Sequence, residues 1–256
     1  MTSERGSADR DDARGAADRG DVDRGDVGLY EGLVTTRAIR RYRDEAIPET
    51  DLRDMLFAAT RAPSGSNRQP FRFVVLTSGP VAQEAKRLIG EGAQRFWGAK
   101  RDADGYDRGS GTERDSPKSR VARTMQEYVD NYGTVPVVVL ACFVPYRDPS
   151  PADGASIYPA CQNLLLAARA LGYGGVMTGW HYAVEPALRS LLQIPEDTLI
   201  CATITLGRPV GQHGPVRRRP LPELVYSDKW GEAPVWAVDP PGVGHAAGGP
   251  PSGRNL

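Results

Sequence analysis

The sequence predicts a single layered domain in which helices cover a β-sheet, of the α/β or α+β class. Segments with helical and with strand patterns alternate along the chain, as they do in folds of this kind. Three strand-like segments are almost continuously apolar, which is typical of strands covered on both faces. Between two polar ends lies a body of roughly 200 residues, within the usual size of one domain.

The first helix is predicted after Pro48, where Thr50 can cap an amphipathic segment that ends before Pro63 and Gly65. Its apolar residues recur at i, i+3, i+4 and i+7: Leu52, Met55, Leu56 and Ala59. A second, longer helix is predicted over 154–172, with Pro159 tolerated near its first turn. Its apolar positions are Ile157, Leu164, Ala168 and Leu171.

Strands are predicted over 71–77, 135–144 and 199–206, which are rich in β-branched and apolar residues. The segment 91–131 differs, because its centre at 101–119 is charged and glycine-rich. An insertion of that length without secondary structure is usually a lid or a disordered loop. We therefore predict a lid insertion at 91–131 and keep the disordered loop as its alternative.

The two ends are predicted to be tails around a working domain at 29–230. Residues 1–28 contain almost no large apolar side chains, so burial cannot offset the entropy of ordering them. We expect a disordered N-terminal tail there. Residues 231–256 are rich in Pro and Gly, which predicts an extended strap or a disordered tail.

Charge and cysteine content restrict the partners. The chain has 32 Lys and Arg against 32 Asp and Glu, hence no net charge to attract nucleic acid or an anionic membrane. Its longest apolar run, 135–144, is too short to cross a bilayer. The cysteines are Cys142, Cys161 and Cys201; their odd number and apolar surroundings favour buried thiols in a cytoplasmic protein without a metal site.

Two segments are cationic. The segment 36–42 (TRAIRRY) places Arg37, Arg40 and Arg41 within five positions, and 217–219 repeats the pattern with three arginines. Arginine suits phosphate because its planar guanidinium donates two parallel hydrogen bonds. The two segments therefore predict a phosphate site built from both ends of the domain, with solvated basic turns as the alternative.

Two further segments suit a planar, heteroaromatic ligand. The turn at 61–70 (RAPSGSNRQP) holds small polar side chains between two prolines, which can meet a ring rich in donors and acceptors. The segment 171–180 (LGYGGVMTGW) leaves the long helix through glycines that allow close backbone approach. Ordinary connecting turns remain the alternative for both segments, and neither is a GxGxxG nucleotide motif.

In this order and spacing the four segments resemble the nitroreductase superfamily of FMN-dependent oxidoreductases, over about 29–225. The turn at 61–70 is the most specific match. The resemblance implies an α+β, three-layer fold with a central, mainly antiparallel sheet flanked by helices, in an intertwined homodimer with FMN at the interface. Two departures, Thr36 and Ala38, stand where many members have Arg and Ser, which weakens two polar FMN contacts.

Carried over by position, the resemblance implies the roles of individual residues. Arg37 and Arg41 approach the FMN phosphate beside Ala38, and Arg218 completes that site with help from Arg217 or Arg219. Arg40 reaches the N1 and O2 edge of the flavin. The partner subunit's flavin is met by Pro63, Ser64 and Asn67, and Gln69 of the same turn also contacts the cofactor. The ring is lined by Met177, Thr178 and Gly179, and a backbone amide of Gly179 or Trp180 donates to N5 and O4.

The implied function is hydride transfer from NADH or NADPH to a nitroaromatic, quinone or similar small-molecule acceptor in a ping-pong cycle. Because the flavin itself carries the hydride, no catalytic side chain is predicted, and the lone His181 is more often structural than a substrate contact. Two alternatives remain. One is a specialised flavin-dependent dehydrogenase or reductive dehalogenase, and the other is a flavin-binding or sensing protein without turnover.

Overall fold

The computed structural model describes residues 27–246, so the predicted tail at 1–28 lies almost wholly outside the described residues, as does 247–256. Within the described range the helices and strands are α1 (Leu29–Thr35), α2 (Glu49–Ala59), β1 (Phe71–Leu76), α3 (Pro80–Ala103), α4 (Pro117–Asp130), β2 (Val137–Phe143), α5 (Gly154–Ala170), β3 (Gly174–Thr178), α6 (Glu185–Leu192) and β4 (Leu199–Gly207).

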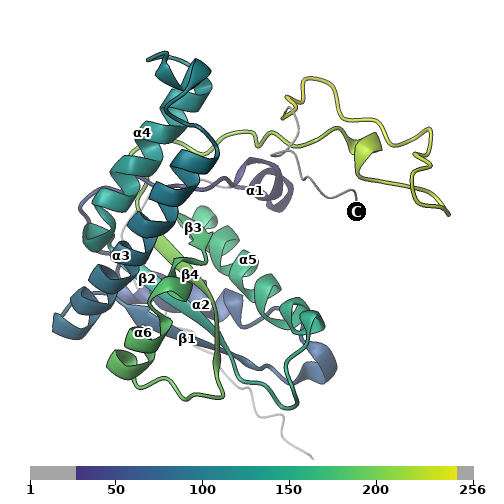
Figure 1. Cartoon of the computed structure of the whole chain (residues 1–256). Helices are drawn as coiled ribbons and strands as arrows, with labels where there is room; N and C mark the ends of the chain where they lie inside the picture. Colours follow the sequence, from purple (N-terminus) through teal and green to yellow (C-terminus); the bar gives the residue numbers. More distant parts are fainter. Residues whose placement is uncertain (1–26, 247–256) are drawn as a thin grey trace, which may run out of the picture.

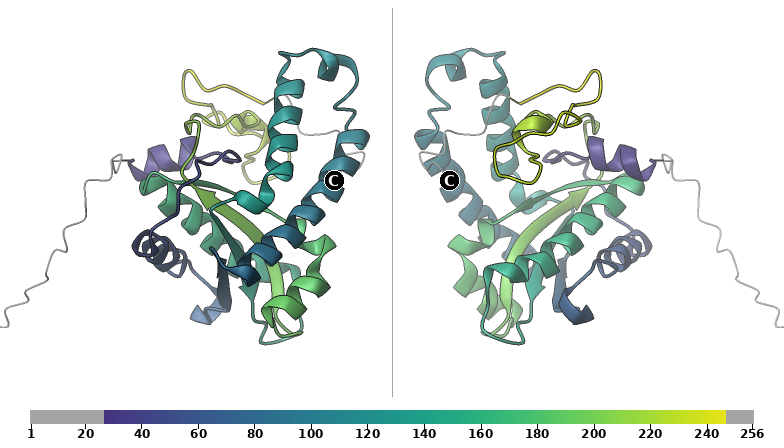
Figure 2. Two further views of the ribbon diagram at one scale, coloured as in Figure 1. Left: turned by 90° about the vertical axis from the view of Figure 1, so that its left-hand side faces the viewer. Right: turned by 90° about the vertical axis from the view of Figure 1, so that its right-hand side faces the viewer.

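The sheet forms the middle of three layers (Figures 1 and 2). Its strand order is β1-β2-β4-β3, and each neighbouring pair is antiparallel. Helices α2 and α5 cover one face, while α3, α4 and α6 lie on the other. The structure confirms the α+β class and the antiparallel sheet, and it places β3 at one edge.

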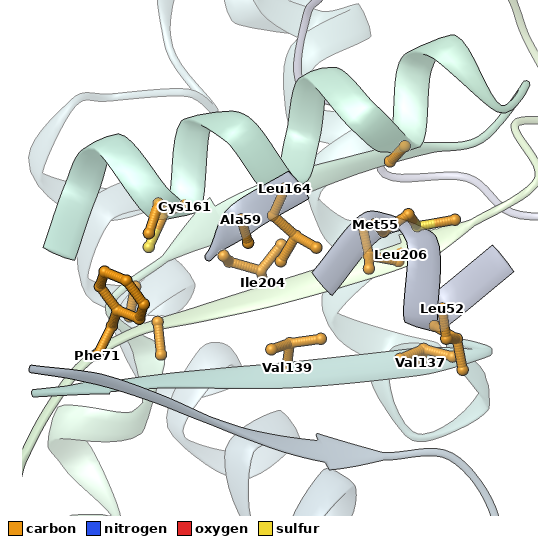
Figure 3. Close-up of a cluster of buried hydrophobic side chains, with 14 of the residues drawn as sticks. Leu52, Met55, Ala59, Phe71, Val137, Val139, Cys161, Leu164, Ile204 and Leu206 are labelled. Atoms are coloured by element: carbon orange, nitrogen blue, oxygen red, sulfur yellow. The ribbon is translucent and has the colours of Figure 1, made fainter. Parts of the chain in front are cut away.

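The sheet is buried on both faces because β2 is apolar at every position and β4 departs from this only at Thr203, Thr205 and Gly207. Val137 and Val139 of β2 contact the layer of α2 and α5 (Figure 3), whereas Val138 and Leu140 contact the opposite layer. All seven residues of β2 are buried. Successive side chains of a strand point to opposite faces, so a continuously apolar strand indicates two covering layers, as predicted.

Segment 91–131 differs from the expectation of a structureless insertion. Helix α3 continues to Ala103, and α4 begins at Pro117 after Ser116, whose side chain accepts a hydrogen bond from the Ser119 N–H. The helices are joined where the Trp97 Nε1–H donates to Gln126 Oε1 at 3.0 Å. The prediction of an irregular segment over 101–119 is therefore wrong at both ends of that range, because each end is helical.

Three smaller features differ from, or add to, the elements that the sequence predicts. Thr50 lies inside the first turn of α2, and the cap position is Pro48, without a side-chain cap bond. Strand β3 was not among the predicted strands. Beyond β4 the chain forms an arm that extends away from the sheet, with a single short helical turn at Leu221–Glu223 (Figure 1).

A buried hydrogen bond joins α2 to the start of β3. The Tyr173 hydroxyl donates to the Asp51 carboxylate at 2.7 Å, and both residues are buried. Burial and the adjacent carboxylate raise the pKa of Tyr173 to about 12. The phenol is therefore neutral in the folded protein over a wider pH range than in the unfolded chain.

We expect Tyr173→Phe to lower the free energy of unfolding near neutral pH by about 1.5–3 kcal/mol, because a buried carboxylate loses a donor. Since the pKa of Tyr173 in the folded chain lies above the ordinary tyrosine value of 10.0, the contribution is complete below pH 10 and is lost as the pH rises toward 12. Urea unfolding across this range should show a smaller alkaline loss in the variant. An equal alkaline loss in both proteins would contradict the assignment.

Candidate functional site

The first cationic segment lies against the edge of the sheet. The Ile39 N–H donates to the Gly175 carbonyl of β3 at 3.0 Å, and the Arg43 N–H donates to the Arg208 carbonyl after β4 at 2.8 Å. The cationic segment at 36–42 is thus next to β3, which lies within the predicted segment 171–180, and next to the end of β4. We call residues 36–43 the edge segment.

Two glycines of β3 permit close packing, Gly174 against the edge segment and Gly175 against β4. A Cβ atom on Gly174 would lie 2.5 Å from Ile39 Cγ1 and 3.0 Å from His213 Nε2, and one on Gly175 would lie 2.3 Å from the Thr205 carbonyl oxygen. Such distances are too short for real contacts. The glycines are therefore required for packing, in addition to ending the connection from α5.

His213 was not predicted from the sequence, yet it supports the edge segment. Its Nδ1 accepts from the Arg37 N–H at 3.5 Å, so Nε2 carries the proton and donates to the Tyr173 carbonyl at 3.2 Å. Burial lowers the pKa of His213, which favours the neutral form that this pairing needs. No motif spacing connects His213 to Arg37, because the two residues are 176 positions apart along the chain.

The three arginines of the edge segment have different surroundings. Arg37 is exposed, and its Nη2 donates to the Gln212 carbonyl at 2.8 Å. Arg41 instead forms an ion pair with Glu127 of α4 at 2.5 Å. Within the described range, the buried Nε of Arg40 and the buried Oγ1 of Thr36 have no hydrogen-bond partner. Buried polar atoms are normally paired, and of the five such unpaired atoms in the described residues these are the two on the edge segment, where a ligand can meet them.

The free edge of β3 continues past this point. The Gly175 carbonyl faces the edge segment, and the backbone alternates along a strand, so the N–H and C=O of Met177 face the same open side. The Met177 side chain is 42% exposed. Thr178 turns inward, where its hydroxyl lies 2.7 Å from that of Thr203. Backbone groups near Met177 can therefore meet the polar rim of a planar ligand.

Beyond Gly179, the side chain of Trp180 is buried. The Trp180 ring packs at 5.2 Å from Tyr128 and 5.7 Å from Tyr132, measured between ring centroids. His181 is also fully buried, with Nε2 2.8 Å from the Ile200 carbonyl oxygen. Both side chains lie in the interior, which favours a structural role for His181.

The turn at 61–70 lies at the other end of the sheet. It leads into Phe71, which pairs with Phe143, itself paired with Leu199 at the start of β4. The edge segment meets the far end of that nine-residue strand, roughly 25 Å away at about 3.3 Å per residue. Within one chain the structure does not bring Pro63, Ser64, Asn67 and Gln69 next to the arginines of the edge segment.

This turn is held in an unusual backbone conformation. Ser66, Asn67 and Gln69 have φ values of 52°, 51° and 50°, in the left-handed region that side chains disfavour. The Ser64 hydroxyl accepts from the Gln69 N–H at 3.0 Å, and Ser156 Oγ of α5 accepts from the Gly65 N–H at 3.2 Å. Residues held in such conformations are often found at functional sites.

The late basic residues run past the edge segment. The Val216 N–H donates to the Val34 carbonyl at 3.2 Å, so Arg218 lies beyond that pair, on the arm. It is exposed and forms an isolated bridge with His245. Ala38 is exposed too.

In the described part of the chain there is no cluster of His, Cys, Asp and Glu suited to a metal ion, and no helix long and apolar enough to cross a membrane.

Comparison with protein families identifies the fold and its relatives. The model of the nitroreductase family matches residues 33–208, which is more than half of the chain and includes the edge segment, the turn at 61–70 and β3. The chain belongs to the nitroreductase family. The predicted membership is confirmed.

Named relatives cover most of this nitroreductase-family chain. An NADH dehydrogenase of Thermus thermophilus is 29% identical over 205 residues, 74% of this chain and 90% of that protein. A 4-nitrobenzoate reductase of a Nocardioides strain is 28% identical over 198 residues, 69% of this chain and 78% of that protein. A Desulfitobacterium hafniense nitroreductase solved with bound FMN shares the fold, with a TM-score of 0.53, 21% identity and coverage of 73% and 92%.

We expect Gly174→Ala to displace the edge segment, because the new methyl group overlaps Ile39 and His213. The variant should lose about 1–3 kcal/mol of unfolding free energy, the usual cost of overpacking, and the amides of residues 36–43 should exchange faster. Gly211→Ala is the matched control, since a Cβ there meets nothing within 4 Å. Equal exchange in the two variants would show that Gly174 does not control this contact.

Proposed function

We propose that this chain binds FMN and transfers hydride from NADH or NADPH to a nitroaromatic, a quinone or a similar organic acceptor. The observation that carries the proposal is the pair of unpartnered buried atoms, Arg40 Nε and Thr36 Oγ1, beside the open edge of β3. The names of relatives support it, because they include an NADH dehydrogenase, a 4-nitrobenzoate reductase and a nitroreductase with bound FMN.

The residues present fit FMN. The exposed guanidinium of Arg37 is suited to the phosphate, together with Arg218 and its neighbours on the arm. Arg40 supplies a positive charge for the polar rim of the ring, where it stabilises negative charge. Backbone N–H groups from Met177 to Trp180 can donate to the same rim. Arg41 is already paired with Glu127, so we assign it to holding α4.

When bound, FMN accepts hydride from one substrate and returns it to another. This supports a ping-pong order in which the nicotinamide leaves before the acceptor enters. The protein's part is then to bind and orient, which agrees with a site made of arginines and backbone groups. The α3 and α4 helices rise beside the edge segment (Figure 2), and we keep the proposal that they act as a lid.

We also propose a homodimer with two sites at its interface. The turn at 61–70 is roughly 25 Å from the edge segment of its own chain, so it can contribute to a site only on a second copy. The arm exposes several large apolar side chains, which monomers rarely leave in water. They are Leu224, Trp230, Val235, Trp236 and Val238.

Arg40→Ala should weaken FMN binding roughly ten- to hundredfold, because one charge-assisted contact of about 1.5–3 kcal/mol is lost. Fluorescence titration with FMN measures this. Arg53→Ala is the control, because Arg53 is exposed on α2 and pairs with Asp54 at 3.2 Å. FMN binding that is unchanged by the loss of Arg40 would contradict its placement at the ring.

Turnover separates the functional alternatives. The wild-type chain with FMN should oxidise NADH or NADPH when menadione or nitrofurazone is added. Bound FMN without reduction by either nicotinamide would favour a flavin-binding protein. Reduction by nicotinamide without transfer to these acceptors would favour a specialised dehydrogenase or dehalogenase. A chain that gains no flavin absorbance from added FMN would contradict the whole proposal.

The double variant Trp230→Ser, Trp236→Ser should lower the dimer affinity, because two exposed indoles lose the apolar surface that we expect the second copy to bury. Multi-angle light scattering should give a dimer for the wild-type chain and a concentration-dependent mass for the variant. Val81→Ser, on an exposed residue of α3, serves as the control. A monomeric wild-type chain at micromolar concentration would rule out the shared site.

A further inference from the structure

A chain of three hydroxyl groups connects α4 to the edge segment through the sheet. The Tyr128 hydroxyl lies 2.7 Å from Thr205 Oγ1, and the Tyr42 hydroxyl lies 2.7 Å from the same atom. The Tyr42 hydroxyl is also 2.6 Å from the Ile39 carbonyl oxygen. Tyr128 and Thr205 are almost fully buried, beside a cluster of buried apolar residues.

The carbonyl at the end fixes the direction of every bond in this chain. A carbonyl oxygen can only accept, so Tyr42 donates its single proton to Ile39. Thr205 must then donate to the oxygen of Tyr42, and Tyr128 must donate to the oxygen of Thr205. Each hydroxyl therefore donates once, and the order runs from α4 through β4 to the peptide that precedes Arg40.

The backbone of Ile39 is held on both of its sides. The Ile39 carbonyl accepts from Tyr42, while the Ile39 N–H donates to Gly175 on β3. The next residue is Arg40, whose Nε has no partner in the described part of the chain. A second link from α4 reaches the following residue, through the ion pair between Glu127 and Arg41. Neighbouring residues of α4 thus hold both sides of Arg40.

We propose that Tyr128 and Tyr42 are positioning residues that set the place of Arg40, so that the position of α4 is coupled to the charge beside the ligand. The coupling rests on the proposed role of Arg40 toward FMN, whereas the hydrogen-bond chain does not. A shift of α4 breaks the bond between Tyr128 and Thr205 and loosens the Ile39 peptide, which moves the guanidinium.

The electrostatics of the cluster agree with this role. Burial raises the pKa of Tyr128 and of Tyr42, and the nearby guanidinium of Arg40 acts on both in the opposite direction. Arg40, Tyr42 and Tyr128 line the same cavity, and burial keeps both phenols protonated in the folded chain. Neutral phenols hold the segment without cancelling the charge of Arg40.

The test compares Tyr128→Phe and Tyr42→Phe with Tyr132→Phe, a buried phenol of the same aromatic cluster that is not bonded to Thr205. Hydrogen exchange of residues 36–43 should be roughly fivefold faster in Tyr128→Phe, as for the loss of one hydrogen bond of about 1 kcal/mol. It should be faster still in Tyr42→Phe, which frees the Ile39 carbonyl, and unchanged in Tyr132→Phe.

The second readout is the reduction potential of bound FMN, which should fall in Tyr128→Phe and Tyr42→Phe because a displaced Arg40 stabilises the reduced ring less. If Tyr42→Phe fails to fold, Thr205→Val interrupts the chain of bonds with little change of shape. Exchange rates and potentials equal to those of Tyr132→Phe would overturn the inference while leaving FMN binding intact. A wild-type chain that binds no FMN would instead overturn the proposed function. Hydrogen exchange alone would then test whether the hydroxyl chain holds the edge segment in place.

Discussion

The open edge of β3 is the constraint on which the site depends. An edge strand presents unpaired backbone groups that must find partners. Here the Ile39 N–H satisfies the carbonyl of Gly175, and Gly174 leaves room for Ile39 because it has no side chain. One contact therefore brings two distant segments together. It also leaves the rest of the edge, from Met177 onward, open to a ligand.

The same contact determines how a crowded group of cations is tolerated. Three arginines within five positions repel one another, and a short extended segment cannot separate them by much. The structure gives each arginine a different environment. Arg37 donates to the Gln212 carbonyl, and Arg41 pairs with the Glu127 carboxylate. Arg40 lies with the two neutral phenols of Tyr42 and Tyr128. Arg40 directly follows Ile39, the residue paired with the strand edge, and a positive charge there can stabilise a ring with developing negative charge.

How far the sequence predicts the molecule depends on how local the signal is. Strands β1, β2 and β4 and helices α2 and α5 carry clear apolar patterns and lie within a few residues of the predicted ranges. Strand β3 has two glycines in five residues, so only its pairing with β4 makes it a strand. The charged end of α3 resembles a loop, yet Lys100 and Asp104 form an i,i+4 ion pair on a helix. Tyr42, Thr205 and Tyr128 lie too far apart in sequence for any spacing to connect them.

Hydroxyl groups in a buried layer have a consequence that apolar side chains do not. An apolar contact tolerates sliding by a fraction of an ångström, but a buried hydroxyl that loses its partner costs about 1–3 kcal/mol. Thr205 has one proton to donate and lies 2.7 Å from two phenols on different elements, so only one relative placement of α4 and the edge segment satisfies all three groups. Apolar packing brings α4 to the sheet, and the hydroxyl chain fixes where on the sheet it lies. Because that chain ends at the Ile39 carbonyl, just before Arg40, the position of α4 determines the position of the Arg40 charge.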